Sequence, residues 1–230
     1  MKVIGLIGGM SWESTVEYYR LINDTVKQRL GGLHSAKCVL YSVDFAEVEK
    51  YQRQGQWAEA AELLGNAAQQ LERAGAALVL ICTNTMHKLA DAIQGRIGIP
   101  LLHIADATAD AVQQAGLRRV GLLGTRFTME EDFYRGRLAD HFGLEVLIPG
   151  VEDRREVHRV IYEELCLGEI RSESKAHLAA IMKRQVEKGA QGIILGCTEL
   201  GLLLNSTDSR VPLIDTTRVH AMAAVKAALE

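Results

Sequence analysis

Two apolar segments that end in a cysteine and small polar residues constrain the fold of this chain more than any other feature. One covers residues 76–87, with the sequence AALVLICTNTMH, and the other covers residues 192–200, with the sequence GIILGCTEL. An uncharged run of this length is typical of a strand buried on both faces, and the residues after each run are typical of the start of a helix. Two strand-to-helix junctions of the same kind indicate an α/β fold.

Each segment follows a related segment at a similar distance, which indicates an internal duplication. Residues 3–8 (VIGLIG) precede the first segment by about 75 residues, and residues 120–125 (VGLLGT) precede the second by about 73. Alternating strands and helices give parallel sheets that bind ligands at the carboxyl ends of their strands. We therefore expect two pseudo-symmetric parallel-sheet half-domains with helices on both faces, and an active site in the cleft between them.

Helix and turn signals set the expected boundaries. The N-terminal half-domain covers residues 1–100, with residues 213–230 returning to it, and the C-terminal half-domain covers residues 101–212, because Pro100 marks a break. Beside the two apolar segments, we expect strands at 2–7, 37–43, 119–123, 144–148 and 213–215, and helices at 13–30, 56–73, 84–93, 106–115, 128–142, 154–165, 172–188 and 216–229. Residues 47–54 are expected to form a polar loop, and Thr128 and Glu131 have the spacing of a capping box.

The composition favours a small-molecule ligand. The 230 residues are 48% apolar and carry a formal net charge of −3, with both signs mixed along the chain. This provides ample core, but no basic stripe for nucleic acid and no polybasic patch for a membrane. The first apolar run is too short for a signal peptide, and no run has membrane-spanning length. We expect a cytoplasmic protein.

The four cysteines are expected to be free thiols. Cys38, Cys82, Cys166 and Cys197 show no Cys-x-x-Cys spacing and no histidine cluster, so neither a disulfide framework nor a metal site is indicated. The position of Cys197 suits a reactive thiol, because it lies between a strand end and a helix N-terminus that would stabilise a thiolate. The alternative for Cys197 is a buried structural role.

These residues resemble the aspartate/glutamate/hydantoin racemase superfamily, and most closely its aspartate racemase branch, over essentially the whole chain. Its two signatures are an apolar strand into Cys-Asn-Thr and an apolar strand into Gly-Cys-Thr followed by Asp, Glu or His. Residues 80–85 (LICTNT) and 195–199 (LGCTE) match them, and the Gly-Gly-Met turn that ends in Met10 is similar too. The resemblance implies a racemase without a cofactor, with one thiol on each side of the substrate α-carbon, and suggests a homodimer.

Racemisation by proton transfer needs a base on one face of the α-carbon and an acid on the other. A thiol suits both roles, because a free cysteine titrates near ~8.5. No lysine motif for pyridoxal phosphate is visible, so we expect hydrogen bonds to stabilise the carbanion. The expected substrate contacts are Met10, Gln52, Asn84, Thr85, Thr125, Cys166, Thr198 and Glu199. Glu199 and His87 are candidate auxiliaries; the alternative is an ordinary capping or surface role.

The chain departs from the first signature at its cysteine. The family places a cysteine directly before Asn-Thr, where this chain has Thr83, and Cys82 lies one residue earlier. A shift of one residue along a strand reverses the direction of the side chain, so we expect Cys82 to face the core and Thr83 to face the substrate. Threonine is no general base at physiological pH. The expected catalytic pair is Cys197 and Thr83, with a preference for the L-enantiomer.

A second departure concerns the distal carboxylate of an acidic substrate. By resemblance, aspartate racemases hold it with a basic residue after the second strand and a lysine further along the chain. Here Val48 and Cys166 stand at those places, with Gln52 and Arg53 as candidate substitutes. Aspartate or glutamate is the first expectation, and a broad-specificity amino-acid racemase is the alternative.

Three other classes are open to different degrees. A hydrolase or ligase would use Cys197 as its nucleophile and needs a histidine base, for which His87 is the candidate at a strand end. A non-catalytic two-lobed amino-acid-binding protein would lose the base, as Thr83 suggests. A nicotinamide enzyme is disfavoured, because residues 5–9 (GLIGG) lack the G-x-G-x-x-G spacing.

Overall fold

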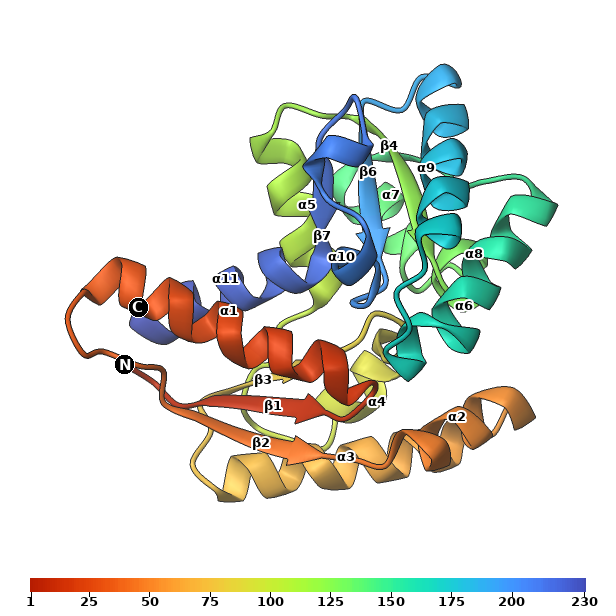
Figure 1. Cartoon of the computed structure of the whole chain (residues 1–230). Helices are drawn as coiled ribbons and strands as arrows, with labels where there is room; N and C mark the ends of the chain where they lie inside the picture. Colours follow the sequence, from red (N-terminus) through yellow and green to blue (C-terminus); the bar gives the residue numbers. More distant parts are fainter. The chain divides into compact units, whose positions relative to one another are not determined.

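The computed structural model describes residues 1–230 as an α/β fold with two parallel sheets flanked by helices (Figure 1). The chain divides into two compact units. Unit 1 contains Met1–Ile104 and His220–Glu230, and unit 2 contains Ala105–Val219. Residues 213–219, which the sequence analysis grouped with the first half, therefore lie in unit 2. None of the helices is long and apolar enough to cross a membrane.

Unit 1 is built on a three-stranded sheet in the order β2-β1-β3. Its strands are β1 (Ile4–Gly8), β2 (Cys38–Ser42) and β3 (Leu78–Ile81), and its helices are α1 (Trp12–Leu30), α2 (Phe45–Gln54), α3 (Trp57–Arg73), the 3-10 helix η1 (Thr85–Leu89), α4 (Ala90–Gln94) and most of α11 (Thr216–Leu229). β1 and β3 are buried along their whole length, because α1 and α11 cover one face of the sheet and α3 covers the other (Figure 1).

Unit 2 is built on a four-stranded sheet in the order β5-β4-β6-β7. Its strands are β4 (Arg119–Gly124), β5 (Glu145–Leu147), β6 (Gly192–Gly196) and β7 (Leu213–Asp215). Its helices are α5 (Ile104–Gln114), α6 (Arg126–Glu130), α7 (Arg135–Phe142), α8 (Val151–Glu163), α9 (Ser172–Glu187) and α10 (Leu200–Leu203), with 3-10 helices η2 (Leu165–Leu167) and η3 (Ser206–Asp208). The central strands β4 and β6 are again the buried ones.

The two sheets repeat one topology, which confirms the predicted pseudo-symmetry. The order β2-β1-β3 matches β5-β4-β6, and β1 and β4 end in equivalent glycines, Gly8 and Gly124. The fourth strand of unit 2, β7, also has a short counterpart in unit 1. Leu101 forms an isolated bridge with Val79 of β3, whereas β7 pairs with β6 at the equivalent place in unit 2.

Helix α2 replaces the polar loop that the sequence analysis expected over residues 47–54. Asp44 caps the helix by accepting a hydrogen bond from a backbone N–H at 3.0 Å, and Gly55 ends it in the left-handed conformation. Its buried face consists of Val48 and Gln52 alone. So narrow an apolar stripe leaves little trace in the sequence, and the prediction of a loop was wrong.

The single helix expected over residues 128–142 is two helices, α6 and α7. Thr125 caps α6 by accepting a hydrogen bond from the N–H of Thr128 at 3.3 Å, so Thr128 is not the cap and the predicted capping box is absent. The backbone becomes extended at Glu131 before α7 begins. Residues 84–93 also differ from the expected single helix, because they start as η1 and continue as α4.

Candidate active site

Strand pairing places Thr83 and Cys197 at equivalent positions of the two units. Ile81 pairs with Ile7 of β1, one residue before Gly8, and Leu195 pairs with Leu123 of β4, one residue before Gly124. Thr83 and Cys197 each follow that pair by two residues. Each therefore lies at the carboxyl edge of its own sheet, where parallel sheets bind ligands.

Cys82 belongs to the core of unit 1. It is fully buried in the apolar cluster that contains Tyr18 of α1 and Val225 of α11. This burial raises the pKa of the Cys82 thiol well above its ordinary value. Thr83, the next residue, is half-buried. The expected change of direction between the two side chains agrees with these placements, and Cys82 is unsuited to act as a base.

Cys197 is a buried thiol that donates to a buried carboxylate. Its Sγ lies 2.8 Å from Oε2 of Glu199, and Oγ1 of Thr198 donates to the same oxygen at 2.9 Å. Only 7% of Cys197 and 2% of Glu199 is exposed. Burial, followed by the charge of Glu199, raises the pKa of Cys197 well above its ordinary value. The free protein therefore holds Cys197 as a protonated thiol.

The expectation that a helix N-terminus lowers the pKa of Cys197 was wrong. The helix that follows, α10, has four residues and begins at Leu200, so its dipole is small. Desolvation and the adjacent carboxylate outweigh it. The Cys-Thr-Glu triplet showed the carboxylate in the sequence, but the burial, which is the larger cause, could not be seen there.

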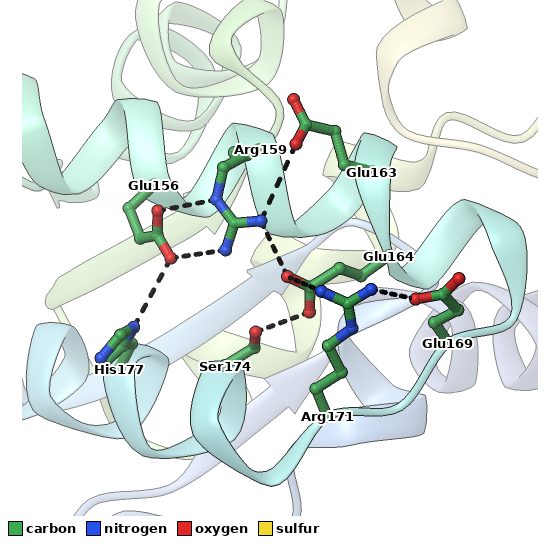
Figure 2. Close-up of polar contacts among 8 residues, drawn as sticks. All are labelled: Glu156, Arg159, Glu163, Glu164, Glu169, Arg171, Ser174 and His177. Atoms are coloured by element: carbon green, nitrogen blue, oxygen red, sulfur yellow. Dashed lines mark hydrogen bonds and ion pairs between the residues drawn. The ribbon is translucent and has the colours of Figure 1, made fainter.

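Cys166 lies in η2, close to Cys197 and two residues after Glu164, which is the centre of a network of hydrogen bonds and ion pairs (Figure 2). The thiol is close enough to contribute to the raised pKa of Cys197. Its neighbour Glu164 is buried and accepts hydrogen bonds from Arg159 at 2.8 Å and from Ser174 at 2.5 Å. Burial acts to raise the pKa of Glu164, but the hydrogen bonds of Ser174 and Arg159 outweigh it, and the pKa is lowered. The turn that carries Cys166 is thus anchored by an ionised glutamate.

The backbone of Glu164 also shapes this turn. Its carbonyl oxygen accepts hydrogen bonds from the N–H groups of Leu167 at 3.0 Å and Glu169 at 2.9 Å. Arg171 approaches the carboxylate of Glu164 as well, at 3.7 Å (Figure 2). The sequence analysis missed Glu164; the only signal was a pair of adjacent glutamates, which is ordinary on a helix surface.

In unit 1, His87 holds the backbone of Thr83. Nε2 of His87 accepts a hydrogen bond from the N–H of Ile104 at 3.1 Å, so in the neutral ring the proton is on Nδ1, which donates to the carbonyl of Thr83 at 2.8 Å. His87 is buried, so the alternative of a surface residue is wrong. Because both ring nitrogens bind backbone atoms, His87 is not available as the base of a cysteine hydrolase.

A second histidine belongs to the same cluster. His220, the first residue of unit 1 after the return from unit 2, donates from Nε2 to the carbonyl of Leu102 at 2.9 Å and accepts from the hydroxyl of Tyr18 at 2.8 Å. Its ring centroid lies 5.7 Å from that of His87. Burial and the neighbouring His87 lower the pKa of His220 to about 3. The chain leaves unit 1 after Ile104 and returns at His220, and neutral imidazoles hold the backbone at both places.

The remaining predicted contacts are mostly buried. Asn84 and Thr85 follow Thr83 directly and begin η1, and Thr125 lies at the end of β4 in unit 2. The side chain of Met10 is in the apolar core together with Val48, which leaves only its backbone for a ligand. Gln52 is buried and donates to Sδ of Met86 at 2.9 Å.

The candidate substitute cation, Arg53, lies at the surface of unit 1. Arg53 is 70% exposed and pairs with Glu49 at 3.7 Å on the surface of α2. No group of three or more His, Cys, Asp or Glu side chains is arranged to hold a metal ion.

The fold and the site define a class: parallel α/β proteins of two similar units, with a thiol at the strand end of one unit and a threonine at the matching position of the other. The sequence model of the Asp/Glu/Hydantoin racemase family matches residues 7–224. The chain belongs to this family, which is a family of isomerases.

Similar proteins fit this assignment. The chain is 22% identical to the broad-specificity amino-acid racemase RacX of Bacillus subtilis (strain 168), over 97% of this chain and 96% of that protein. A crystal structure of a candidate Asp/Glu racemase from Yersinia pestis is 57% identical, with a TM-score of 0.92 and full coverage of both chains. An aspartate racemase homologue from Pyrococcus horikoshii OT3 is 36% identical, with a TM-score of 0.86 and full coverage of both.

Proposed function

We propose that the protein is an amino-acid racemase that uses no cofactor, acts on aspartate or glutamate and prefers the L-enantiomer. The observation that carries the proposal is the strand register, which gives Thr83 in unit 1 the same position as Cys197 in unit 2. We assign these two side chains to opposite faces of the substrate α-carbon. Only one of them has a thiol, so the two faces are chemically unequal.

Glu199 is the group that can take the proton of Cys197. The thiol already donates to its Oε2, so transfer along this hydrogen bond gives a thiolate and a neutral carboxylic acid. The raised pKa of Cys197 opposes this transfer in the free protein. The positive α-ammonium of a bound amino acid would offset the negative charge near Cys197, and would favour the thiolate when substrate is present.

The thiolate then removes the α-proton of the L-enantiomer and leaves a carbanion. The side chains of Asn84, Thr85 and Thr198, with nearby backbone N–H groups, are the proposed donors to the α-carboxylate that carries the developing charge. All three are buried, so their hydrogen bonds would act in surroundings of low dielectric constant.

The fate of the carbanion depends on which side returns a proton. Return from Cys197 regenerates the L-enantiomer with exchange of the α-hydrogen. A proton passed from water through the Thr83 hydroxyl to the opposite face gives the D-enantiomer, and the proton held by Glu199 returns to the solvent, which restores the hydroxyl, the thiol and the carboxylate. A hydroxyl is a poor base, so the D-enantiomer should rarely be deprotonated. Since mirror-image amino acids have equal free energy, net interconversion must have equal kcat/KM in both directions, and the L preference must be mostly exchange with retention.

A broad-specificity racemase is the second candidate, and one observation favours it. Val48 is fully buried in the core, and Cys166 carries no positive charge, so neither can replace the cations that aspartate racemases are expected to use. The two candidates differ in a simple test. NMR of L- and D-amino acids in deuterated buffer should show loss of the α-proton signal fastest for L-aspartate or L-glutamate. Equal rates for neutral and acidic amino acids would establish the second candidate.

The same experiment tests the proposed chemistry itself. Binding of amino acids without any exchange of the α-hydrogen would instead identify a non-catalytic binding protein. We further propose that the protein is a homodimer in the cytoplasm, which follows from the family alone; light scattering of the purified chain tests the dimer.

A further inference from the structure

A pocket of about 420 Å³ in unit 2 is lined mainly by basic side chains. Helices α6 and α8 supply four arginines and a histidine, and Glu130 is the one carboxylate in the lining. We propose that this pocket binds a small oxyanion, either a phosphate group or the second carboxylate of an acidic amino acid. The basic residues of the lining are Arg126, Arg154, Arg155, His158 and Arg159.

Two of the arginines are already neutralised by the protein. Arg154 donates to Oε1 of Glu130 at 2.7 Å and to the carbonyl of Pro149 at 2.8 Å. Arg159 donates to both carboxylate oxygens of Glu156 and to Glu164, as Figure 2 shows. These two arginines form the wall of the pocket and are not free to bind a ligand.

The other two arginines retain their capacity for an anion. Arg126 is exposed, and its guanidinium makes no ion pair; the guanidinium carbon lies 5.4 Å from the centroid of the Phe127 ring. Arg155 pairs only with Glu152, and the two side chains are 73% and 82% exposed. An ion pair this exposed contributes little to stability, so a ligand can readily replace Glu152 as the partner of Arg155. A guanidinium without a counterion among further arginines favours the binding of an oxyanion.

His158 supplies an oriented neutral donor. Its Nδ1 accepts a hydrogen bond from the backbone N–H of Arg126 at 3.2 Å, so in the neutral ring the hydrogen is on Nε2. The ring centroid lies 4.7 Å from that of Tyr162, which fixes its orientation. Burial and then the charge of Arg126 lower the pKa of His158, although Glu130 and Glu163 act in the opposite direction. A bound anion would raise this pKa by offsetting the charge of Arg126.

The pocket lies at the carboxyl edge of the unit 2 sheet. Arg126 directly follows Thr125 at the end of β4, and β4 pairs with β6, which ends beside Cys197. This position allows two sources for the oxyanion. The first is a separate phosphate, and the second is the substrate's distal carboxylate; the second source rests on the proposed function, whereas the binding of an oxyanion does not.

NMR of the histidine side chains during titration with inorganic phosphate, L-aspartate and L-alanine tests the proposal on the full chain. We expect phosphate or L-aspartate, but not L-alanine, to raise the pKa of His158. Arg126→Gln should weaken this binding by about tenfold or more, which corresponds to one charge-assisted hydrogen bond. Arg155→Gln should weaken it less. Arg20→Gln removes an exposed charge from α1 in unit 1 and is the matched control.

The possible outcomes distinguish a phosphate site from a site for the distal carboxylate, and they test the anion site independently of racemase activity. A response to phosphate with no response to L-aspartate identifies a separate anion site, and a response to L-aspartate identifies the distal-carboxylate site. No response to either ligand at millimolar concentration, or equal responses in the wild type and Arg126→Gln, would overturn the proposal. Phosphate binding is measured without turnover, so its result stands whether or not the protein racemises amino acids.

Discussion

Glu199 accepts hydrogen bonds from both Cys197, at 2.8 Å, and Thr198, at 2.9 Å, on the same oxygen, Oε2. One carboxylate thereby orients the thiol and, together with burial, raises the pKa of Cys197. This arrangement differs from a cysteine activated by a helix N-terminus, in which the thiolate already exists in the free protein. The reactivity of Cys197 should therefore depend on Glu199 more than on any helix.

Replacement of Glu199 by Gln should separate the effect of its charge on the pKa of Cys197 from its proposed role as proton acceptor. Loss of the negative charge lowers the pKa of Cys197, so alkylation of this cysteine should begin at a lower pH than in the wild type. Exchange of the α-hydrogen should nevertheless fall by at least about tenfold, because the proton acceptor is lost. Mass spectrometry of the alkylated peptide gives the first result, and Glu187→Gln on the surface of α9 is the control. An unchanged alkylation profile would contradict the assigned contact.

The two buried cysteines should respond differently to the same substitution. Cys197→Ser should abolish exchange of the α-hydrogen and leave substrate binding roughly intact, because serine keeps the hydrogen bond but offers no accessible anion. Cys82→Ser should mainly reduce stability, by ~1–3 kcal/mol for a hydroxyl in an apolar core. Cys82→Ala avoids the buried hydroxyl and should retain activity. Loss of exchange in folded Cys82→Ala would show that the assignment of Thr83 is wrong.

A lysine at position 166 should change specificity. Cys166 lies on the turn anchored by Glu164 and close to Cys197, so Cys166→Lys would bring a positive charge near the substrate. We expect the ratio of kcat/KM for aspartate to that for alanine to rise by about tenfold, through a charge-assisted hydrogen bond to the distal carboxylate. Cys38→Lys is a control that adds the same charge in unit 1. An unchanged ratio would mean that position 166 does not contact the substrate side chain.

The buried imidazole of His220 should make the protein less stable in acid. The pKa of His220 is about 3 in the folded chain and near ~6.5 in an unfolded chain, so the unfolded state binds the extra proton between these values. The contribution of neutral His220 to the free energy of unfolding is complete above about pH 6.5 and is lost as the pH falls toward 3. The total loss is on the order of several kcal/mol. Urea unfolding at pH 4.5 and pH 7 should show a smaller difference for His220→Gln than for the wild type. An equal difference would exclude this histidine as the cause.

Much of the fold could be predicted from the sequence, because buried parallel strands are continuous apolar runs. The strand at residues 213–215 and the helix at 216–229 have the predicted bounds, and the repeated segments gave the shared topology of the two sheets. Helix α2 was missed because its buried face is two residues wide. Apolar residues in the sequence predict a helix or strand only when enough of that helix or strand is buried.

The candidate site was predictable in part. The alternation of side chains along a strand predicted that Cys82 faces the core, since that property depends on neighbouring residues only. The histidine cluster could not be predicted, because it joins Tyr18 to His220 across 202 positions. The state of the Cys197 thiol also depends on burial, which a sequence pattern does not give.

The unequal faces of the site can be measured directly. NMR in deuterated buffer, with optical rotation followed in parallel, gives the rate of α-hydrogen exchange for each enantiomer of aspartate and glutamate. For the wild type we predict fast exchange of the L-enantiomer, slow exchange of the D-enantiomer and slow net racemisation. Thr83→Cys should raise both D-exchange and racemisation by ~10²–10⁴, the usual contribution of a general base. Equal exchange of D- and L-substrates by the wild type would contradict the central claim that Cys197 alone provides a base.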